Sequence, residues 1–192
     1  MSDIRVYIQE ICDISPNQMS FNEREVIYNT IKQAGCENLL VFGAGNDSKL
    51  WGMSSINTVV LENDDIWLNK ISTKYKDILE LKFMKVSYNM FKSRQECLDA
   101  IECDDVSMLR VNVSDDIFDI KWDAIIVDSP TGYRESNEYY RASSIRLASQ
   151  LAESGCHIFV HDCDRQIETV AVSRFLDNKQ MRIIDRTGYI LK

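Results

Sequence analysis

The chain has 192 residues, of which 45% are hydrophobic and 27% charged, and it carries 22 Lys and Arg against 30 Asp and Glu. This length and balance predict one globular domain over residues 1–192 and exclude a disordered chain. The formal net charge of -8 argues against a general nucleic-acid binder, which needs a basic surface to neutralise phosphates. No apolar run approaches the ~20 residues of a membrane span, and MSDIRVYIQE lacks a signal-peptide core. We therefore expect no membrane partner and a cytoplasmic location.

Six cysteines are spread along the chain without any CxxC pair: Cys12, Cys36, Cys97, Cys103, Cys156 and Cys163. Their spacing fits neither a zinc site nor the disulfide framework of a small secreted domain. We expect reduced, mostly buried thiols.

The first 35 residues predict a helical lead-in. Residues 1–20 are expected to be irregular or partly helical, and a helix is expected to follow Ser20. Ser20 and Glu23 have the spacing of a capping box, and Gly35 is placed to end the helix.

Short apolar runs and helical patterns alternate over the rest of the chain. We expect strands in residues 39–42 and 58–61 and within the segments 81–88, 108–113, 122–133 and 156–164. We expect helices over 47–55, 64–75, 93–102, 136–153 and 167–176, with two short strands in 181–192. This alternation predicts an α/β, Rossmann-like fold with a mostly parallel twisted sheet and helices on both faces. In such sheets ligands bind at the carboxyl ends of the strands.

The first strand ends in VFGAGNDS, where Gly43 and Gly45 lead into a helix. Glycine permits positive φ and lets a ligand approach the backbone closely. The third glycine of the GxGxxG pattern is missing, which disfavours NAD and FAD. Glu62 ends the next strand about twenty residues later and can accept hydrogen bonds from ribose hydroxyls. Together these features favour a single-nucleoside cofactor such as S-adenosylmethionine.

Two later strands end in acids and a histidine. Asp128 can orient a substrate hydroxyl, act as a base or bind a metal. His161 and Asp162 follow another buried strand, and Asp164 either joins them or caps the next helix. Oxygen and imidazole ligands from neighbouring strand ends suit a divalent ion such as Mg, Mn or Co, and the candidate ligands are Asp128, His161, Asp162 and Asp164.

Arginines near these strand ends are candidates to hold a substrate carboxylate, because guanidinium binds carboxylate bidentately. They are Arg134, Arg141 and Arg165. Tyr133, in the same loop as Arg134, could contact a sugar.

Five segments of the chain, NLLVFGAGNDSKLW, TVVLENDDIWL, VSY, WDAIIVDSPTGY and HIFVHDCDR, occur in this order between about residues 18 and 176. In this combination the chain resembles the plant glucuronoxylan 4-O-methyltransferase family, which has a polysaccharide-biosynthesis methyltransferase domain. The resemblance implies a class I methyltransferase fold and methyl transfer from S-adenosylmethionine to a hydroxyl of a sugar or uronic acid, in a glycan or its precursor. It also implies metal dependence, which has been associated with the family.

The resemblance assigns roles to the strand-end residues. The cofactor-binding residues would be Gly43, Ala44, Gly45, Asp47, Ser48, Glu62 and Asn63; the catalytic residues would be Asp128, His161 and Asp162; and Tyr133, Arg134 and Arg165 would contact the acceptor. The chain departs from the family pattern at Asn46, where a histidine is usual.

Three other functions stay open at this point. The acceptor could be a small metabolite, or the chain could be an NAD-dependent or sugar-nucleotide enzyme on a similar sheet. It could also be an inactive cofactor-binding scaffold, a hypothesis that Asn46 favours.

Overall fold

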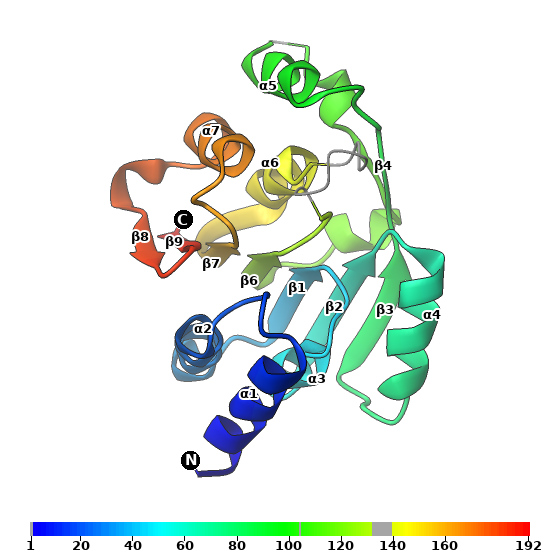
Figure 1. Cartoon of the computed structure of the whole chain (residues 1–192), viewed down its shortest axis with the longest axis vertical. Helices are drawn as coiled ribbons and strands as arrows, with labels where there is room; N and C mark the ends of the chain where they lie inside the picture. The colour runs from blue at the N-terminus through cyan, green and yellow to red at the C-terminus, as the bar shows by residue number, and fades with distance from the viewer. Residues whose placement is uncertain (1, 104, 132–139) are drawn as a thin grey trace.

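The computed structural model describes residues 2–103, 105–131 and 140–192, and its centre is a twisted sheet (Figure 1). Within these residues seven strands form the sheet in the order β3-β2-β1-β6-β7-β9-β8. They are β1 Asn38–Phe42, β2 Asn57–Glu62, β3 Leu81–Lys85, β6 Trp122–Val127, β7 Ala152–Val160, β8 Arg182–Ile184 and β9 Thr187–Leu191. Neighbours from β3 to β7 are parallel, and β9 and β8 are antiparallel. The predicted mostly parallel sheet is confirmed.

Helices cover both faces of this sheet (Figure 1). One core cluster includes residues of α1 Ser2–Ile14, α2 Phe21–Ala34, α3 Ser48–Gly52 and α4 Asp65–Lys74. The other includes residues of α5 Arg94–Glu102, α6 Ala142–Leu151 and α7 Gln166–Phe175. Each cluster packs against its own face of the central strands.

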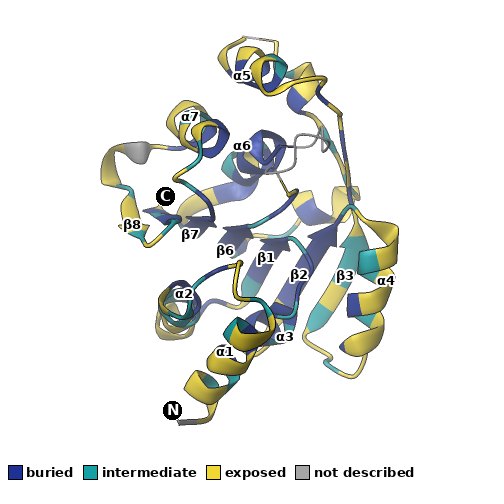
Figure 2. Ribbon diagram, in the orientation of Figure 1, coloured by how far each residue is buried: buried dark blue, intermediate teal, exposed yellow. Residues whose placement is uncertain are grey.

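The strand residues alternate between the two clusters. Leu39 and Val41 belong to the cluster of α1 to α4, whereas Leu40 and Phe42 belong to the cluster of α5 to α7. Successive side chains of a strand point to opposite faces, so a strand covered on both sides needs a continuous apolar run. In Figure 2 the central strands are accordingly buried along most of their length.

Helix α2 begins and ends as its sequence predicts. The Ser20 side chain accepts a hydrogen bond from the backbone N–H of Glu23, and the Glu23 carboxylate accepts one from the backbone N–H of Ser20. Gly35 ends the helix with φ at 67°, in the left-handed region that glycine enters without strain.

Several expected elements differ from the structure. Residues 2–14 form the regular helix α1, because Ile8 and Ile11 pack into the core. The expected strand over 81–88 divides into β3 and β4 Ser87–Tyr88, and β4 pairs with β5 Val111–Asn112 in a separate two-stranded sheet. The segment expected as a strand over 108–113 begins inside a short 3₁₀ helix, Ser107–Leu109.

The helix expected over residues 136–153 ends at Leu151, and β7 starts directly at Ala152. Ala152 pairs with Trp122, and a register shift follows before Ala124 pairs with His157. The expected helix start falls partly in 132–139, outside the described residues.

All six cysteines are free thiols, as predicted, but only Cys36, Cys97 and Cys156 are buried. Among the residues that the structure describes, no helix combines the length and the apolar character that crossing a membrane requires.

Candidate active site

Four strand ends meet at one edge of the sheet and are joined by backbone hydrogen bonds. Gly43 N–H donates to the carbonyl of Leu61 at 2.8 Å, and Asp128 N–H donates to that of Phe42 at 2.9 Å. His161 N–H donates to the carbonyl of Val127 at 3.0 Å. The ends of β2, β1, β6 and β7 therefore form one continuous rim. It contains the point between β1 and β6 where the strand order reverses, the usual ligand site of such sheets.

A cavity of about 570 Å³, here called the first cavity, opens at the ends of β1, β2 and β6. This volume lies within the roughly 300–1,000 Å³ typical of small-molecule sites. It is lined by six of the seven predicted cofactor residues, Gly43, Ala44, Gly45, Asp47, Glu62 and Asn63. Sequence reasoning missed Gln18, Trp67 and Thr131, which also line it.

The glycine loop is shaped by close contacts that a side chain would prevent. Gly43 has φ at +113°, and a Cβ there would lie 3.0 Å from the Cβ of Ser129. A Cβ at Gly45 would lie 2.6 Å from a carboxylate oxygen of Asp47. Ser48, the seventh predicted cofactor residue, is buried and accepts a hydrogen bond from Gly45 N–H at 3.0 Å. The Ser48 side chain therefore supports the loop and does not line the cavity.

Glu62 ties the first and second strand ends together. Its buried carboxylate accepts hydrogen bonds from the backbone N–H groups of Ala44 at 3.0 Å and of Asn63 and Asp64 at 2.8 Å. Burial raises the pKa of Glu62, against the opposing effect of these hydrogen bonds. Two of these donors bind Oε1 and one binds Oε2. The carboxylate therefore keeps a lone pair that can accept a hydrogen bond from a ligand in the cavity.

Asp47 is buried and lines the first cavity; burial raises the pKa of its carboxyl, and the charge of Arg24 opposes this shift. Nη2 of the fully buried Arg24 lies 3.6 Å from Asp47 Oδ2. Arg24 comes from α2, and no feature of its local sequence indicates a place beside the glycine loop.

Asn46, the departure from the family pattern, faces away from the first cavity. Its amide donates to Ser15 Oγ at 3.2 Å and accepts from Lys74 Nζ at 2.9 Å. It lines a separate, smaller cavity beside α1 and α4. Its side chain therefore does not line the proposed cofactor cavity.

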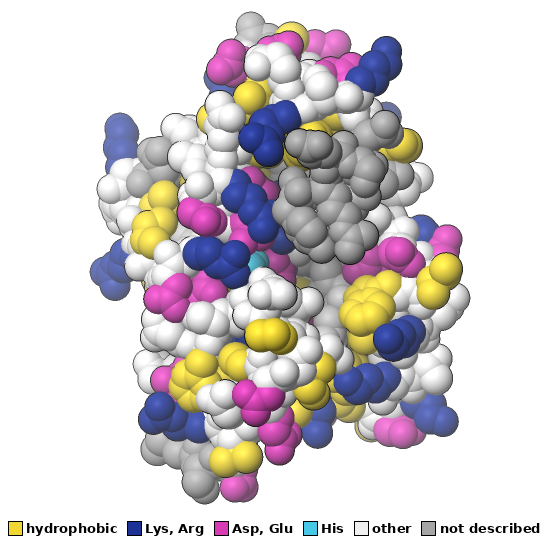
Figure 3. All heavy atoms as spheres, viewed as in Figure 1, with side chains coloured by type: hydrophobic (Ala, Val, Ile, Leu, Met, Phe, Trp, Pro, Cys, Tyr) yellow, Lys and Arg dark blue, Asp and Glu magenta, His cyan; other side chains and the backbone are white. Residues whose placement is uncertain are grey.

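A second cavity of about 680 Å³ adjoins the first. Its walls include Asp128, Arg141, His161, Asp162 and Arg165, and residues 14–18, between α1 and α2, complete it. Gln18, Asp128 and Thr131 line both cavities. Asp128 therefore stands at their junction. On the face of the molecule seen in Figure 3, basic and acidic side chains lie next to one another, and a small part of a histidine side chain is visible between them.

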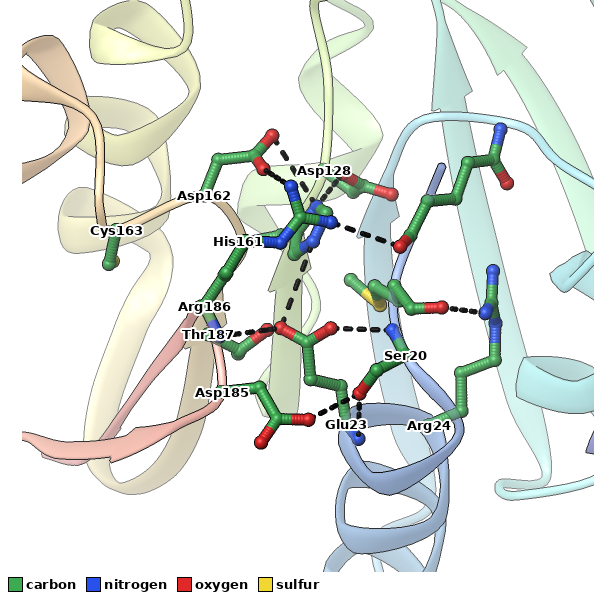
Figure 4. A network of polar contacts seen from close by, with 12 residues as sticks. Ser20, Glu23, Arg24, Asp128, His161, Asp162, Cys163, Asp185, Arg186 and Thr187 are labelled. Atoms are coloured by element: carbon green, nitrogen blue, oxygen red, sulfur yellow. Dashed lines mark hydrogen bonds and ion pairs between the residues drawn. The ribbon is translucent and has the colours of Figure 1, made fainter. Parts of the chain in front are cut away.

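Asp128 is held by two neighbours through one oxygen. His161 Nδ1 lies 2.7 Å and Arg141 Nη2 3.0 Å from its Oδ1. Burial alone would raise the pKa of Asp128, but the charges of His161 and Arg141 outweigh it and the pKa is lowered. In Figure 4 the other oxygen of Asp128 points away from His161. Asp128 is thus an ionised carboxylate with one oxygen left for a ligand.

Asp162 lies beside this group and binds three arginines. Its carboxylate is 2.5 Å from Arg141 Nη1, 2.9 Å from Arg165 Nη2 and 2.9 Å from Arg186 Nη1. Its φ of 61° is unusual for a residue other than glycine. The side chain is 2% exposed, so Asp162 acts as a buried counterion.

The predicted metal ligands are only partly brought together. One ligand atom each of Asp128, His161 and Asp162 lies within 4.8 Å of the others, whereas Asp164 is exposed and outside the group. However, Oδ1 of Asp128 and both carboxylate oxygens of Asp162 already contact guanidinium groups. A divalent cation would have to displace the Arg141 guanidinium from both carboxylates. These residues therefore do not fit a metal ion.

Glu23, which sequence reasoning treated only as a helix cap, is a fully buried member of the same network (Figure 4). Besides Ser20 N–H, its carboxylate accepts hydrogen bonds from Thr187 Oγ1 at 2.8 Å and from Arg186 N–H at 3.1 Å. His161 Nε2, which has no hydrogen-bond partner among the described residues, lies 3.8 Å from it. Glu23 therefore joins α2, the turn before β9 and the rim.

Glu23→Gln is expected to lower the free energy of unfolding by about 1–3 kcal/mol, because the amide places N–H groups against donors that now meet a carboxylate. Urea unfolding curves would measure the loss. Glu25→Gln, on the same helix but paired with Arg5 at the surface, is the matched control and should change stability by less than about 0.5 kcal/mol. Equal, small effects of both substitutions would contradict a structural role for Glu23.

Two predicted acceptor residues, Tyr133 and Arg134, lie outside the described residues. Arg165 lines the second cavity with a side chain that is 30% exposed. Arg141, also a candidate for a substrate carboxylate, binds Asp128 and Asp162 of the protein itself.

Residues 22–190 match the family model described as IRX15/IRX15L/GXM, which covers most of the chain. The chain belongs to the IRX15/IRX15L/GXM family. Among relatives, glucuronoxylan 4-O-methyltransferase 3 of Arabidopsis thaliana is 32% identical, with 88% of this chain and 62% of that protein covered. Arabinogalactan O-methyltransferase 2 of the same plant is 30% identical, with 84% and 62% covered. The chain thus spans about three fifths of the length of these relatives.

The fold is also that of solved methyltransferases. The O-methyltransferase from Bacillus cereus in complex with SAH superposes with a TM-score of 0.58 at 10% identity, covering 99% of this chain and 91% of that one. At this identity the likeness concerns the fold alone, and it confirms the predicted Rossmann-like class I methyltransferase architecture.

Proposed function

We propose that the protein is an S-adenosylmethionine-dependent O-methyltransferase that acts on a hydroxyl of a sugar or uronic acid, in a glycan or its precursor. The observation that carries the proposal is the junction of two cavities at the ionised Asp128. One cavity has the glycine loop and the acid of a nucleoside site, and the other has arginines and polar groups. Such a pair of adjoining cavities suits a reaction between a bound nucleoside and a separate polar acceptor.

The first cavity fits the cofactor. The Gly43–Gly45 loop permits close approach, and Glu62 retains an acceptor for ribose hydroxyls. When bound, S-adenosylmethionine supplies a sulfonium methyl group, which passes to the acceptor oxygen as the carbon–sulfur bond breaks. Asp47 and Gln18 also line this cavity and are placed to contact the polar end of the cofactor.

Asp128 is the proposed general base. It lies between the cavities, so a hydroxyl in the second cavity can give its proton to the carboxylate while its oxygen faces the first cavity. His161 and Arg141 hold Oδ1 and thereby fix the direction of the carboxylate. His161 positions this base, and Asp162 balances the charge of the arginines beside it. The mechanism places neither residue at the reacting atoms.

The second cavity is the proposed acceptor site. Arg165 and the polar residues of the turn between α1 and α2 give it groups that bind hydroxyls and carboxylates. By their names, the relatives methylate glucuronoxylan and arabinogalactan, which supports a glycan acceptor. The cytoplasmic location and the absence of nucleic-acid and membrane partners stay predictions from the sequence.

Cofactor and acceptor can be tested separately. Calorimetry should show binding of S-adenosylhomocysteine and none of NAD at the same concentration. Methyl transfer should then be assayed with uronic-acid-bearing oligosaccharides and with the corresponding neutral sugars, and we expect faster transfer to the uronates. Binding of NAD alone would indicate an oxidoreductase, and cofactor binding without turnover on any sugar would indicate an inactive scaffold or a different acceptor.

A further inference from the structure

We propose that Arg141 occupies the place that a divalent metal would take beside Asp128, and that it positions the base so that methyl transfer needs no metal ion. This proposal rests on the proposed function. From the sequence, Arg141 is expected to bind a carboxylate of the acceptor. In the structure it binds two carboxylates of the protein itself.

The first argument is the geometry of the three would-be ligands. Nη2 of Arg141 is 3.0 Å from Asp128 Oδ1, and Nη1 is 2.5 Å from Asp162 Oδ2. The same two oxygens lie 2.7 Å (Asp128 Oδ1) and 3.5 Å (Asp162 Oδ2) from Nδ1 of His161, the third candidate ligand. A single planar guanidinium therefore bridges the two carboxylates, as its fixed donors allow. A metal ion at the same oxygens would overlap it.

The second argument is that Arg141 cannot move aside easily. Its side chain is 4% exposed, Nε donates to the carbonyl of Pro130 at 3.2 Å, and Nη1 also donates to the carbonyl of His161 at 2.9 Å. The backbone thus holds the guanidinium independently of the carboxylates. Displacement would leave a buried cation without its counterions, which is strongly unfavourable.

The third argument is charge. Asp162 also binds Arg165 and Arg186, each at 2.9 Å, so three guanidinium groups surround one of the candidate ligands. His161 Nδ1, the nitrogen in the group, is already engaged with Asp128 at 2.7 Å. A divalent cation would meet positive charge on several sides and would have to break this hydrogen bond as well.

The consequence is that arginine performs the two tasks a metal could perform for Asp128. It keeps the carboxylate ionised, because guanidinium does not lose its proton in proteins. It also fixes Oδ1 and leaves the second oxygen for the acceptor hydroxyl. Arg141 is thus a positioning residue, acting through Asp128.

The first test is metal binding, which does not depend on finding the acceptor. Mn²⁺ and Co²⁺ should be titrated by calorimetry into the full chain loaded with S-adenosylhomocysteine. We expect no site that saturates below about 1 mM metal, in the wild type and in Asp128→Asn alike. Saturable binding in the micromolar range that Asp128→Asn abolishes would overturn the proposal, even if no methyl transfer had been detected.

The second test uses Arg141→Lys and Arg141→Met, with Arg146→Met further along α6 as the matched control. We expect kcat to fall roughly tenfold or more in Arg141→Met, with the Kd of S-adenosylhomocysteine within about twofold of wild type. Added guanidinium at millimolar concentration should restore part of kcat in Arg141→Met only, which a purely structural role would not produce. Chelator-treated wild type should keep its full activity.

The opposite pattern would reject the inference. A chelator-induced loss of more than tenfold that Mn²⁺ or Co²⁺ restores, or an Arg141→Lys enzyme as active as the wild type without any change in kcat or KM, would show that the guanidinium is not required. If Arg141→Met does not fold, Arg141→Lys and the metal titration still decide.

Discussion

Asp128→Asn is expected to lower kcat for methyl transfer by a factor of about 10²–10⁴, the range that a positioned general base contributes. The amide has nearly the same shape but cannot accept a proton at neutral pH. It also places an N–H group or an uncharged oxygen against His161 Nδ1 and Arg141 Nη2, which now share Oδ1 at 2.7 and 3.0 Å. Initial rates with a saturating uronate acceptor would measure the loss.

Binding of S-adenosylhomocysteine separates this effect from damage to the cofactor site. Asp128 lines both cavities, but the glycine loop and Glu62 are the proposed cofactor contacts, so the Kd should change by no more than about threefold. Asp164→Asn, an exposed acid near the same rim, is the control and should leave both quantities unchanged. A normal kcat in Asp128→Asn would remove Asp128 from the mechanism.

Glu62→Gln is expected to weaken S-adenosylhomocysteine binding by about 100-fold. The carboxylate now accepts three backbone hydrogen bonds, at 2.8 to 3.0 Å, through both of its oxygens. In either orientation, a glutamine amide turns its NH₂ group toward at least one of these backbone N–H donors. The two donors then face each other without an acceptor, and burying such unsatisfied groups costs about 1–3 kcal/mol. The glycine loop would shift, and a charged acceptor for the ribose hydroxyls would be lost.

Calorimetry and urea unfolding of the same variant distinguish the two contributions. Asp65→Asn makes a suitable control, because Asp65 is an exposed acid at the start of α4 that pairs with Lys85. That variant should bind S-adenosylhomocysteine like the wild type. An unchanged Kd in a stably folded Glu62→Gln protein would count against the ribose role of Glu62.

The residues at the strand ends could be predicted because each is encoded locally. A short apolar run predicts a buried parallel strand, and the residue that follows it must lie at the carboxyl edge of the sheet. This reasoning placed Gly43, Glu62, Asp128 and His161 on one rim, and the structure brings their loops together. The ends of α2 were predictable for the same reason, since capping depends on neighbours three residues apart.

The remaining site residues could not be predicted, because tertiary contacts bring them in. Arg24, Gln18 and Arg186 come from α2, the turn before it and the turn before β9. Glu23 had a sufficient local explanation as a cap, which hid its contacts with Thr187 and Arg186.

Asp162 was a reasonable metal ligand from its place beside His161. Only the partners 21 and 24 residues away, Arg141 and Arg186, show that it is a counterion. A pattern of residue types along one strand end cannot reveal which charges the fold brings to it from elsewhere.

The two cavities differ in what their walls are made of, and this has a consequence for specificity. The first cavity, the proposed cofactor site, includes glycine backbone and a carboxylate bound to main-chain amides. The second cavity, the proposed acceptor site, is built from side chains that arrive on separate elements, including the turn between α1 and α2. Under the proposed function, a substitution in one of these side chains would change which acceptor fits the second cavity and leave the glycine loop and Glu62 unaltered.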